Sequence, residues 1–85
     1  EMIEIRYFAR LRERLGISAE QIEVTPELTD LRTLTAHLSR RGGVWAEALG
    51  AEQPLMTAVN QELSGLDAPI RDGDEVAYFP PVTGG

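Results

Sequence analysis

The hydrophobic positions at the start of the chain alternate with polar ones, a period of two that is typical of a half-buried β-strand. In residues 2–8, Ile3, Ile5 and Tyr7 are separated by charged side chains. A second alternating stretch covers residues 21–25. Because the connection between the two stretches is short, we expect these strands to pair antiparallel as a hairpin with an elaborated loop.

Between and after these strands, the apolar residues recur at helical intervals. Leu11 and Leu15 lie four residues apart and predict a short helix over residues 9–15, with Gly16 as its stop signal. The main helix is predicted over residues 31–41, where leucines recur at i, i+3 and i+7 and form an apolar stripe on one face. This stripe is expected to lie across the sheet.

The second half of the chain contains shorter elements separated by turn residues. The pattern predicts a short helix over residues 44–49, strands over 55–59, 62–64 and 75–79, and turns at 60–61 and 71–74. Helices on one face of a mixed sheet give an α+β fold, with one main helix and short extra helices. A parallel pairing of the first and last strands at the sheet centre would complete a β-grasp topology.

The amino-acid composition argues against several kinds of partner and of chemistry. The chain has 85 residues, with 14 acidic and 8 basic side chains and a net charge of −6, so we expect no nucleic-acid partner. It contains no apolar run long enough to span a bilayer, so no membrane association and a cytoplasmic location are expected. Cysteine is absent, which excludes a thiol nucleophile or thiolate metal ligand in this sequence. All eight basic residues are arginine, so no lysine is present for Schiff-base or isopeptide chemistry.

The isolated polar motifs favour structural roles. His37 stands alone beside the apolar stripe and is predicted to be a partly exposed helical residue, not a catalytic base or ligand. Residues 72–75, DGDE, lack the spacing of a calcium loop and favour a tight turn around Gly73. Trp45 is expected to pack at the margin of the core. We therefore expect the chain to bind no metal.

Two phenylalanines predict a binding surface. Phe8 and Phe79 each follow a core-directed tyrosine at the end of a strand, so alternation places both on the opposite face of the sheet. If the main helix covers the tyrosine face, the two rings form an uncovered apolar patch, which favours protein binding over second-layer packing. Among the three arginines of residues 10–14, one beside an aromatic strand end is a candidate partner anchor.

The chain is predicted to divide into a domain over residues 1–79 and a tail over residues 80–85, PPVTGG. Pro80 and Pro81 fix the direction in which the tail leaves the domain. The stretch from Pro81 to Gly85 reaches about 13–14 Å when extended, and a glycine pair can enter a narrow channel. Two glycines alone favour fraying. With a stiff exit and an adjacent apolar face, they favour an arm that delivers the terminal carboxylate.

Three stretches of the sequence resemble one family. The ending EVAYFPPVTGG, preceded by DGD, resembles the C-terminal signature of the sulfur-carrier (small) subunits of molybdopterin synthase. MIEIRYFARLRERLG resembles that family's first strand and helix, AVNQEL resembles its middle hairpin, and residues 39–53 match least. The resemblance implies a ubiquitin-like β-grasp protein that stores sulfur as a thiocarboxylate on Gly85.

The resemblance also implies the partners and the site residues. An E1-like enzyme would use ATP to adenylate Gly85, and a sulfur donor protein would convert it to the thiocarboxylate. The large subunit would use this sulfur to form the dithiolene on cyclic pyranopterin monophosphate, in a heterotetramer. The chain itself would bind no cofactor and supply no catalytic side chain. Docking positions would be Phe8, Arg12, Leu63 and Phe79, and the inserted residues would be Pro80, Pro81, Val82, Thr83, Gly84 and Gly85.

Three alternatives remain open at the level of sequence. The chain is also compatible with a sulfur carrier for another pathway, such as thiamine or cysteine synthesis. It is compatible with a ubiquitin-like modifier joined through Gly85 to lysines of other proteins, since the absence of lysine forbids only self-polymers. The third alternative is a β-grasp binding module with an inert tail. The ending FPPVTGG favours the molybdopterin branch.

Overall fold

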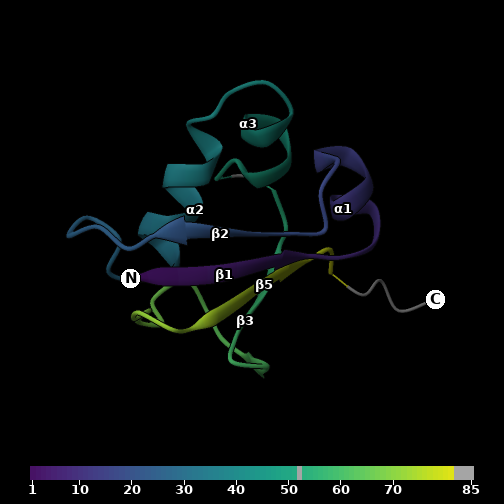
Figure 1. Ribbon diagram of the computed structural model, residues 1–85. Coiled ribbons are helices and arrows are strands. Elements are labelled where there is room, and N and C mark those ends of the chain that lie inside the picture. Colours follow the sequence, from purple (N-terminus) through teal and green to yellow (C-terminus); the bar gives the residue numbers. More distant parts are fainter. Residues whose placement is uncertain (52, 82–85) are drawn as a thin grey trace.

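The computed structural model describes residues 1–51 and 53–81, which form a five-stranded mixed sheet with helices on one face (Figure 1). The elements are β1 (Met2–Tyr7), α1 (Ala9–Leu15), β2 (Ala19–Glu23), α2 (Leu31–Ser39), α3 (Val44–Leu49), β3 (Met56–Val59), β4 (Glu62–Leu63) and β5 (Glu75–Phe79). The strand order is β2-β1-β5-β3-β4. The central pair, β1 and β5, is parallel, and the other pairs are antiparallel. The predicted α+β, β-grasp topology is confirmed.

One hydrophobic core lies between the sheet and the helices. The alternating residues of β1 and the leucine stripe of α2 meet there, as the two periodicities predict. The fully buried side chains include Ile3, Ile5, Leu31, Leu34, Leu38, Val76 and Tyr78. Full burial of one such aliphatic side chain contributes roughly 1.5–3 kcal/mol. Among the described residues, no helix has the length and apolarity needed to cross a bilayer.

The helix α2 ends at Ser39, two residues earlier than predicted. The Arg41 amide donates to the Leu38 carbonyl at 3.1 Å, a three-residue step that tightens the final turn. Gly42 follows with a φ of 81°, a conformation that favours glycine. The Arg41 side chain then pairs with Glu20 of β2.

The strand β2 covers Ala19–Glu23 instead of the predicted residues 21–25. The register pairs Glu20 with the buried Ile5, so this carboxylate lies on the helix-covered face. A charged residue in an inward position broke the hydrophobic pattern and hid the start of the strand. It is tolerated because the Tyr7 hydroxyl donates to it at 2.7 Å and Arg41 donates to both of its oxygens at 2.9 Å.

The predicted turns in the second half are confirmed and are joined to each other. Asn60 and Gln61 have φ values of 51° and 70°, as required between the short strands β3 and β4. The Asn60 amide nitrogen donates to Asp74 at 3.0 Å, and its amide oxygen accepts from the Glu75 backbone at 3.0 Å. Gly73 has a φ of 89°. The acidic residues before β5 therefore organise a turn.

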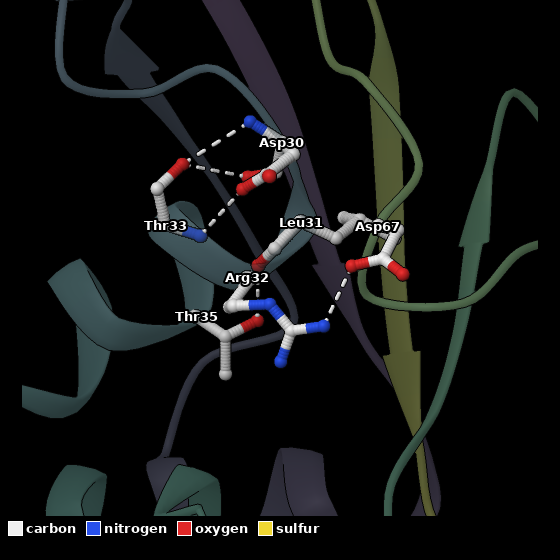
Figure 2. Close-up of polar contacts among 6 residues, drawn as sticks. All are labelled: Asp30, Leu31, Arg32, Thr33, Thr35 and Asp67. Carbon is white, nitrogen blue, oxygen red and sulfur yellow. Dashed lines mark hydrogen bonds and ion pairs between the residues drawn. The ribbon is translucent and has the colours of Figure 1, made fainter.

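The N-terminus of α2 is fixed by the contacts shown in Figure 2. The Asp30 carboxylate accepts from the Thr33 amide at 2.8 Å, and the Thr33 hydroxyl accepts from the Asp30 amide at 3.1 Å. The Arg32 guanidinium pairs with Asp67 at 2.6 Å (Figure 2). In addition, the Leu31 amide donates to the carbonyl of Ala68 at 3.0 Å. These contacts hold the segment before β5 against the main helix.

Candidate functional site

The face of the sheet opposite the helices carries the predicted phenylalanine pair. The ring centroids of Phe8 and Phe79 lie 6.4 Å apart in an edge-to-face arrangement, and Phe8 is 42% exposed. Tyr7 and Tyr78, one residue earlier in each strand, are buried on the helix side and stack with centroids 6.0 Å apart. The alternation therefore predicted this arrangement correctly.

Leu63 lies on the same face as the phenylalanines and is 68% exposed. The sheet register pairs it with Ala58, which in turn pairs with Ala77 of β5. The side chains of Ala58 and Ala77 are short, so the surface between Leu63 and Phe79 is shallow. We call Phe8, Ala58, Leu63, Ala77 and Phe79 the open-face patch. These five residues line one shallow hollow, so three of the four predicted docking residues are brought together.

A charged cluster borders the open-face patch. The Arg6 guanidinium lies 2.8 Å from the Glu4 carboxylate and 3.6 Å from that of Glu75. Sequence analysis did not identify this cluster. The pairing of Glu4 with Glu75 depends on the register of β1 with β5, which the sequence does not fix; once paired, two neighbouring carboxylates favour a cation between them.

Arg12, the fourth predicted docking residue, is exposed on α1 and does not line the hollow of the open-face patch. Its amide donates to the Phe8 carbonyl at 3.2 Å, so it lies one helical turn from the patch. Its proposed contact with a partner stays a prediction.

The base of the predicted tail lies beside α1. Pro80 and Pro81 are partly buried and line a second hollow together with Arg10 and Arg14. Figure 1 shows α1 at the end of the sheet where β5 finishes. The other predicted tail residues, Val82, Thr83, Gly84 and Gly85, lie outside the described residues.

A polar network inside the helix-covered face has a structural role. Burial opposes the ionisation of Glu20, but hydrogen bonds from Arg41 and Tyr7 outweigh it and hold its pKa below the ordinary 4.5. Burial raises the pKa of the Tyr7 hydroxyl, which also donates to Glu20. Both effects keep this pair as a neutral phenol donating to a carboxylate at neutral pH.

The second buried tyrosine is likewise a core residue. Burial raises the pKa of Tyr78, whose hydroxyl lies 2.7 Å from the Thr35 hydroxyl. Thr35 donates to the Leu31 carbonyl at 2.7 Å, so its remaining lone pairs accept from Tyr78. A protonated phenol enclosed in the core cannot serve as a base for a reaction on the surface.

The other residues considered as possible functional residues, His37 and Trp45, lie where the sequence predicted them. His37 is exposed on α2. Trp45 packs edge-on against Tyr7 with centroids 5.5 Å apart, and the Arg41 guanidinium lies 4.4 Å above its ring. No group of three or more histidine, cysteine, aspartate or glutamate side chains that could hold a metal ion occurs within residues 1–51 and 53–81.

Comparison with known proteins gives full-length matches. The model of the ThiS family matches residues 5–85. The molybdopterin synthase sulfur carrier subunit of Escherichia coli K12 is 44% identical over 84 residues, covering 99% of this chain and all of that protein. The small archaeal modifier protein 3 of Haloferax volcanii is 32% identical over 91 residues, covering 98% of each.

A solved structure extends the likeness to three dimensions. A chain of the complex between subunits 1 and 2 of the molybdopterin-converting factor from Helicobacter pylori 26695 has a TM-score of 0.67 and 31% identity, with full coverage of both chains. The likeness is therefore one of overall fold.

Proposed function

The chain belongs to the ThiS family, and from this premise we propose that it is the sulfur-carrier subunit of a molybdopterin synthase. The observation that carries the proposal is the 44% identity, over 99% of the chain, to a protein named as such a subunit. The open-face patch, whose Phe79 directly precedes Pro80 at the base of the tail, supports it. An apolar surface next to a slim tail suits docking followed by insertion.

The proposed chemistry takes place at the terminal carboxylate of Gly85. A carboxylate is a poor electrophile, so an E1-like enzyme binds ATP and lets the carboxylate oxygen attack the α-phosphorus, releasing pyrophosphate. In the resulting acyl-adenylate, a sulfide equivalent from a sulfur donor protein attacks the carbonyl carbon. The carbon–sulfur bond forms as the carbon–oxygen bond to AMP breaks, and the product is a thiocarboxylate.

The proposed role of the folded domain is delivery. The open-face patch docks on the large subunit, and Pro80 and Pro81 limit the directions in which the tail can leave the domain. The thiocarboxylate sulfur is transferred to cyclic pyranopterin monophosphate, and hydrolysis restores the carboxylate. The resemblance implies that acid–base groups come from the large subunit, and Tyr7 and Tyr78 of this chain are enclosed in the core. ATP is a substrate of the activating enzyme, and this chain needs no cofactor of its own.

The proposed assembly is a heterotetramer with a central dimer of large subunits. The full-length likeness to a chain from the complex of subunits 1 and 2 of a molybdopterin-converting factor supports a large-subunit partner. The E1-like enzyme and the sulfur donor protein are implied by the family resemblance, and they would supply the activation and the sulfur that a terminal carboxylate requires.

A second candidate function is protein modification. The relative from Haloferax volcanii, 32% identical, is named a small archaeal modifier protein. In this alternative the activated Gly85 carbonyl would acylate a lysine amine of another protein, with loss of AMP. Both functions use the same activated tail, so the acceptor of the acyl or sulfur group decides between them.

Reconstitution with the large subunit tests the proposed function. The sulfur-loaded chain, the large subunit and the pterin precursor should form the dithiolene, and a chain lacking Gly85 should form none. Failure of the loaded chain to form dithiolene would exclude molybdopterin synthesis. A mass increase on lysines of added proteins, in place of dithiolene, would establish the modifier function.

A further inference from the structure

The helix α1 is positively charged in an acidic protein. It exposes Arg10, Arg12 and Arg14 with Glu13 as its one acidic residue, so three positive charges minus one negative charge give it +2. The whole chain has a net charge of −6, so the remaining residues sum to −8. Positive charge is therefore concentrated on one short element.

This charge lies at the base of the tail. Arg10 and Arg14 line a hollow of about 280 Å³ together with Pro80 and Pro81. The rest of its lining is mainly apolar and includes Leu11, Ala48, Pro54 and Leu55, with no acidic side chain among the described lining residues. Arg10 and Arg14 therefore line the hollow together with mainly apolar residues, next to the point where the tail begins.

Arg10 and Arg14 differ from the three arginines that are held in close ion pairs. Arg6, Arg32 and Arg41 each have a carboxylate oxygen within 2.9 Å. Arg14 reaches Glu47 only at 3.4 Å, and that glutamate side chain is 72% exposed. For Arg10, the described part of the chain supplies no carboxylate within 4.0 Å. The Arg14–Glu47 pair is exposed and therefore weak, and Arg10 is itself exposed, so both side chains are accessible to a partner.

We propose that Arg10 and Arg14 form a cationic rim that contacts acidic side chains around the mouth of the channel through which the large subunit receives the tail. This inference rests on the proposed function. The stretch from Pro81 to Gly85 spans about 13–14 Å when extended, so the rim lies at the channel entrance and away from the reacting carboxylate. The rim therefore acts on docking and not on the chemistry.

The rim is continuous with the open-face patch. Phe8 belongs to the patch and immediately precedes α1, and Phe79 immediately precedes Pro80. Residues of α1 and the base of the tail line the same hollow, so a partner that covers the patch and takes the tail also meets α1. Because the chain is acidic overall, an acidic partner surface would be attracted most where the arginines gather, on α1. The rim thus selects the orientation in which the tail faces the channel.

Association kinetics test the rim. The rate constant for association with the large subunit is measured by stopped-flow for the wild-type chain and for the double variant Arg10→Gln/Arg14→Gln. The matched control is Arg40→Gln/Arg71→Gln, which removes the same total charge from exposed positions away from α1. At low salt we expect roughly a tenfold decrease for the rim variant and less than about a twofold change for the control. In about 0.5 M NaCl the difference should largely disappear.

Arg14→Gln also removes the contact with Glu47, so the single variant Arg10→Gln is measured as well and should show part of the decrease. Equal rates for the two double variants would overturn the rim while leaving the proposed function intact. A faster rate for the rim variant would show that the channel mouth is basic. A wild-type chain that does not bind the large subunit at all would overturn the proposed function together with the rim.

Discussion

At the level of single residues, the helix-covered face of the sheet contains one charge that the hydrophobic pattern does not predict. Glu20 occupies an inward position of β2, where an unpaired carboxylate would be costly. It accepts hydrogen bonds from Tyr7 and from both terminal nitrogens of Arg41. Its carboxylate therefore links the edge strand to the end of the main helix.

Replacing Glu20 by Gln should make the stability of the protein less sensitive to acid. The pKa of Glu20 is lowered in the folded state, so its contribution is fully present above its ordinary pKa of 4.5 and is lost as pH falls through the lowered value. At pH 7 we expect Glu20→Gln to lower the free energy of unfolding by about 1 kcal/mol, since the pair is partly screened by solvent. Urea unfolding at several pH values measures this. A difference from wild type that stays constant below pH 4 would contradict the role of ionised Glu20.

Replacing Phe8 by Ala should weaken partner binding more than folding. Its side chain is 42% exposed, so truncation removes little buried contact within the domain. At the centre of an interface, loss of an aromatic anchor typically costs at least about 2 kcal/mol, or roughly thirtyfold in affinity. Titration calorimetry with the large subunit and thermal melting separate the two effects. A large fall in Tm with unchanged affinity would place Phe8 in the core.

At the level of elements, α2 depends on its N-terminal contacts. Asp30 and Thr33 satisfy each other's backbone amides (Figure 2). The segment before β5 supplies carbonyls for the amides of Leu31 and Arg32. Because α2 supplies three fully buried leucines, loosening its first turn weakens the core as well.

Asp30→Ala should therefore lower Tm by several degrees, because the Thr33 amide in the first turn loses its partner. Arg32→Ala is the matched control in the same turn. It removes only an exposed ion pair with Asp67 and should leave Tm nearly unchanged. Calorimetric melting of both variants measures the effect. An equal loss for the two would show that the ion pair, and not the cap, fixes the helix.

The observed helices and strands show which parts of the fold the hydrophobic periodicity predicted. The bounds predicted for the first helix, the third helix and the last strand agree with α1, α3 and β5. The errors lie where tertiary contacts override the local pattern. The start of β2 was missed because Glu20, which two distant residues hold, breaks the hydrophobic pattern. The end of α2 was placed too late because the last turn tightens before Gly42, and Arg41, beyond the helix, pairs with the same carboxylate. Sequence spacing carries no information on such partners.

At the level of the whole molecule, the two faces of the sheet have different roles, one in folding and the other in the proposed binding. One face packs on the helices, and the other presents the open-face patch beside the base of the tail. Alternation predicted the phenylalanine pair from the sequence, because it fixes which face each side chain occupies. It could not predict that Ala58 and Ala77 complete the patch, since that depends on the pairing of β3 with β5. The role of Gly85 rests on chemistry and on family membership.

The central claim is that sulfur is carried on the carboxylate of Gly85, and intact-mass spectrometry tests it most directly. The chain is incubated with the E1-like enzyme, ATP and the sulfur donor, alongside a variant that lacks Gly85. For the wild-type chain we predict a mass increase equal to the replacement of one oxygen by sulfur, confined to the C-terminal peptide. The variant should show no increase and should keep the wild-type Tm. A wild-type chain of unchanged mass, or sulfur found elsewhere in the chain, would contradict the account.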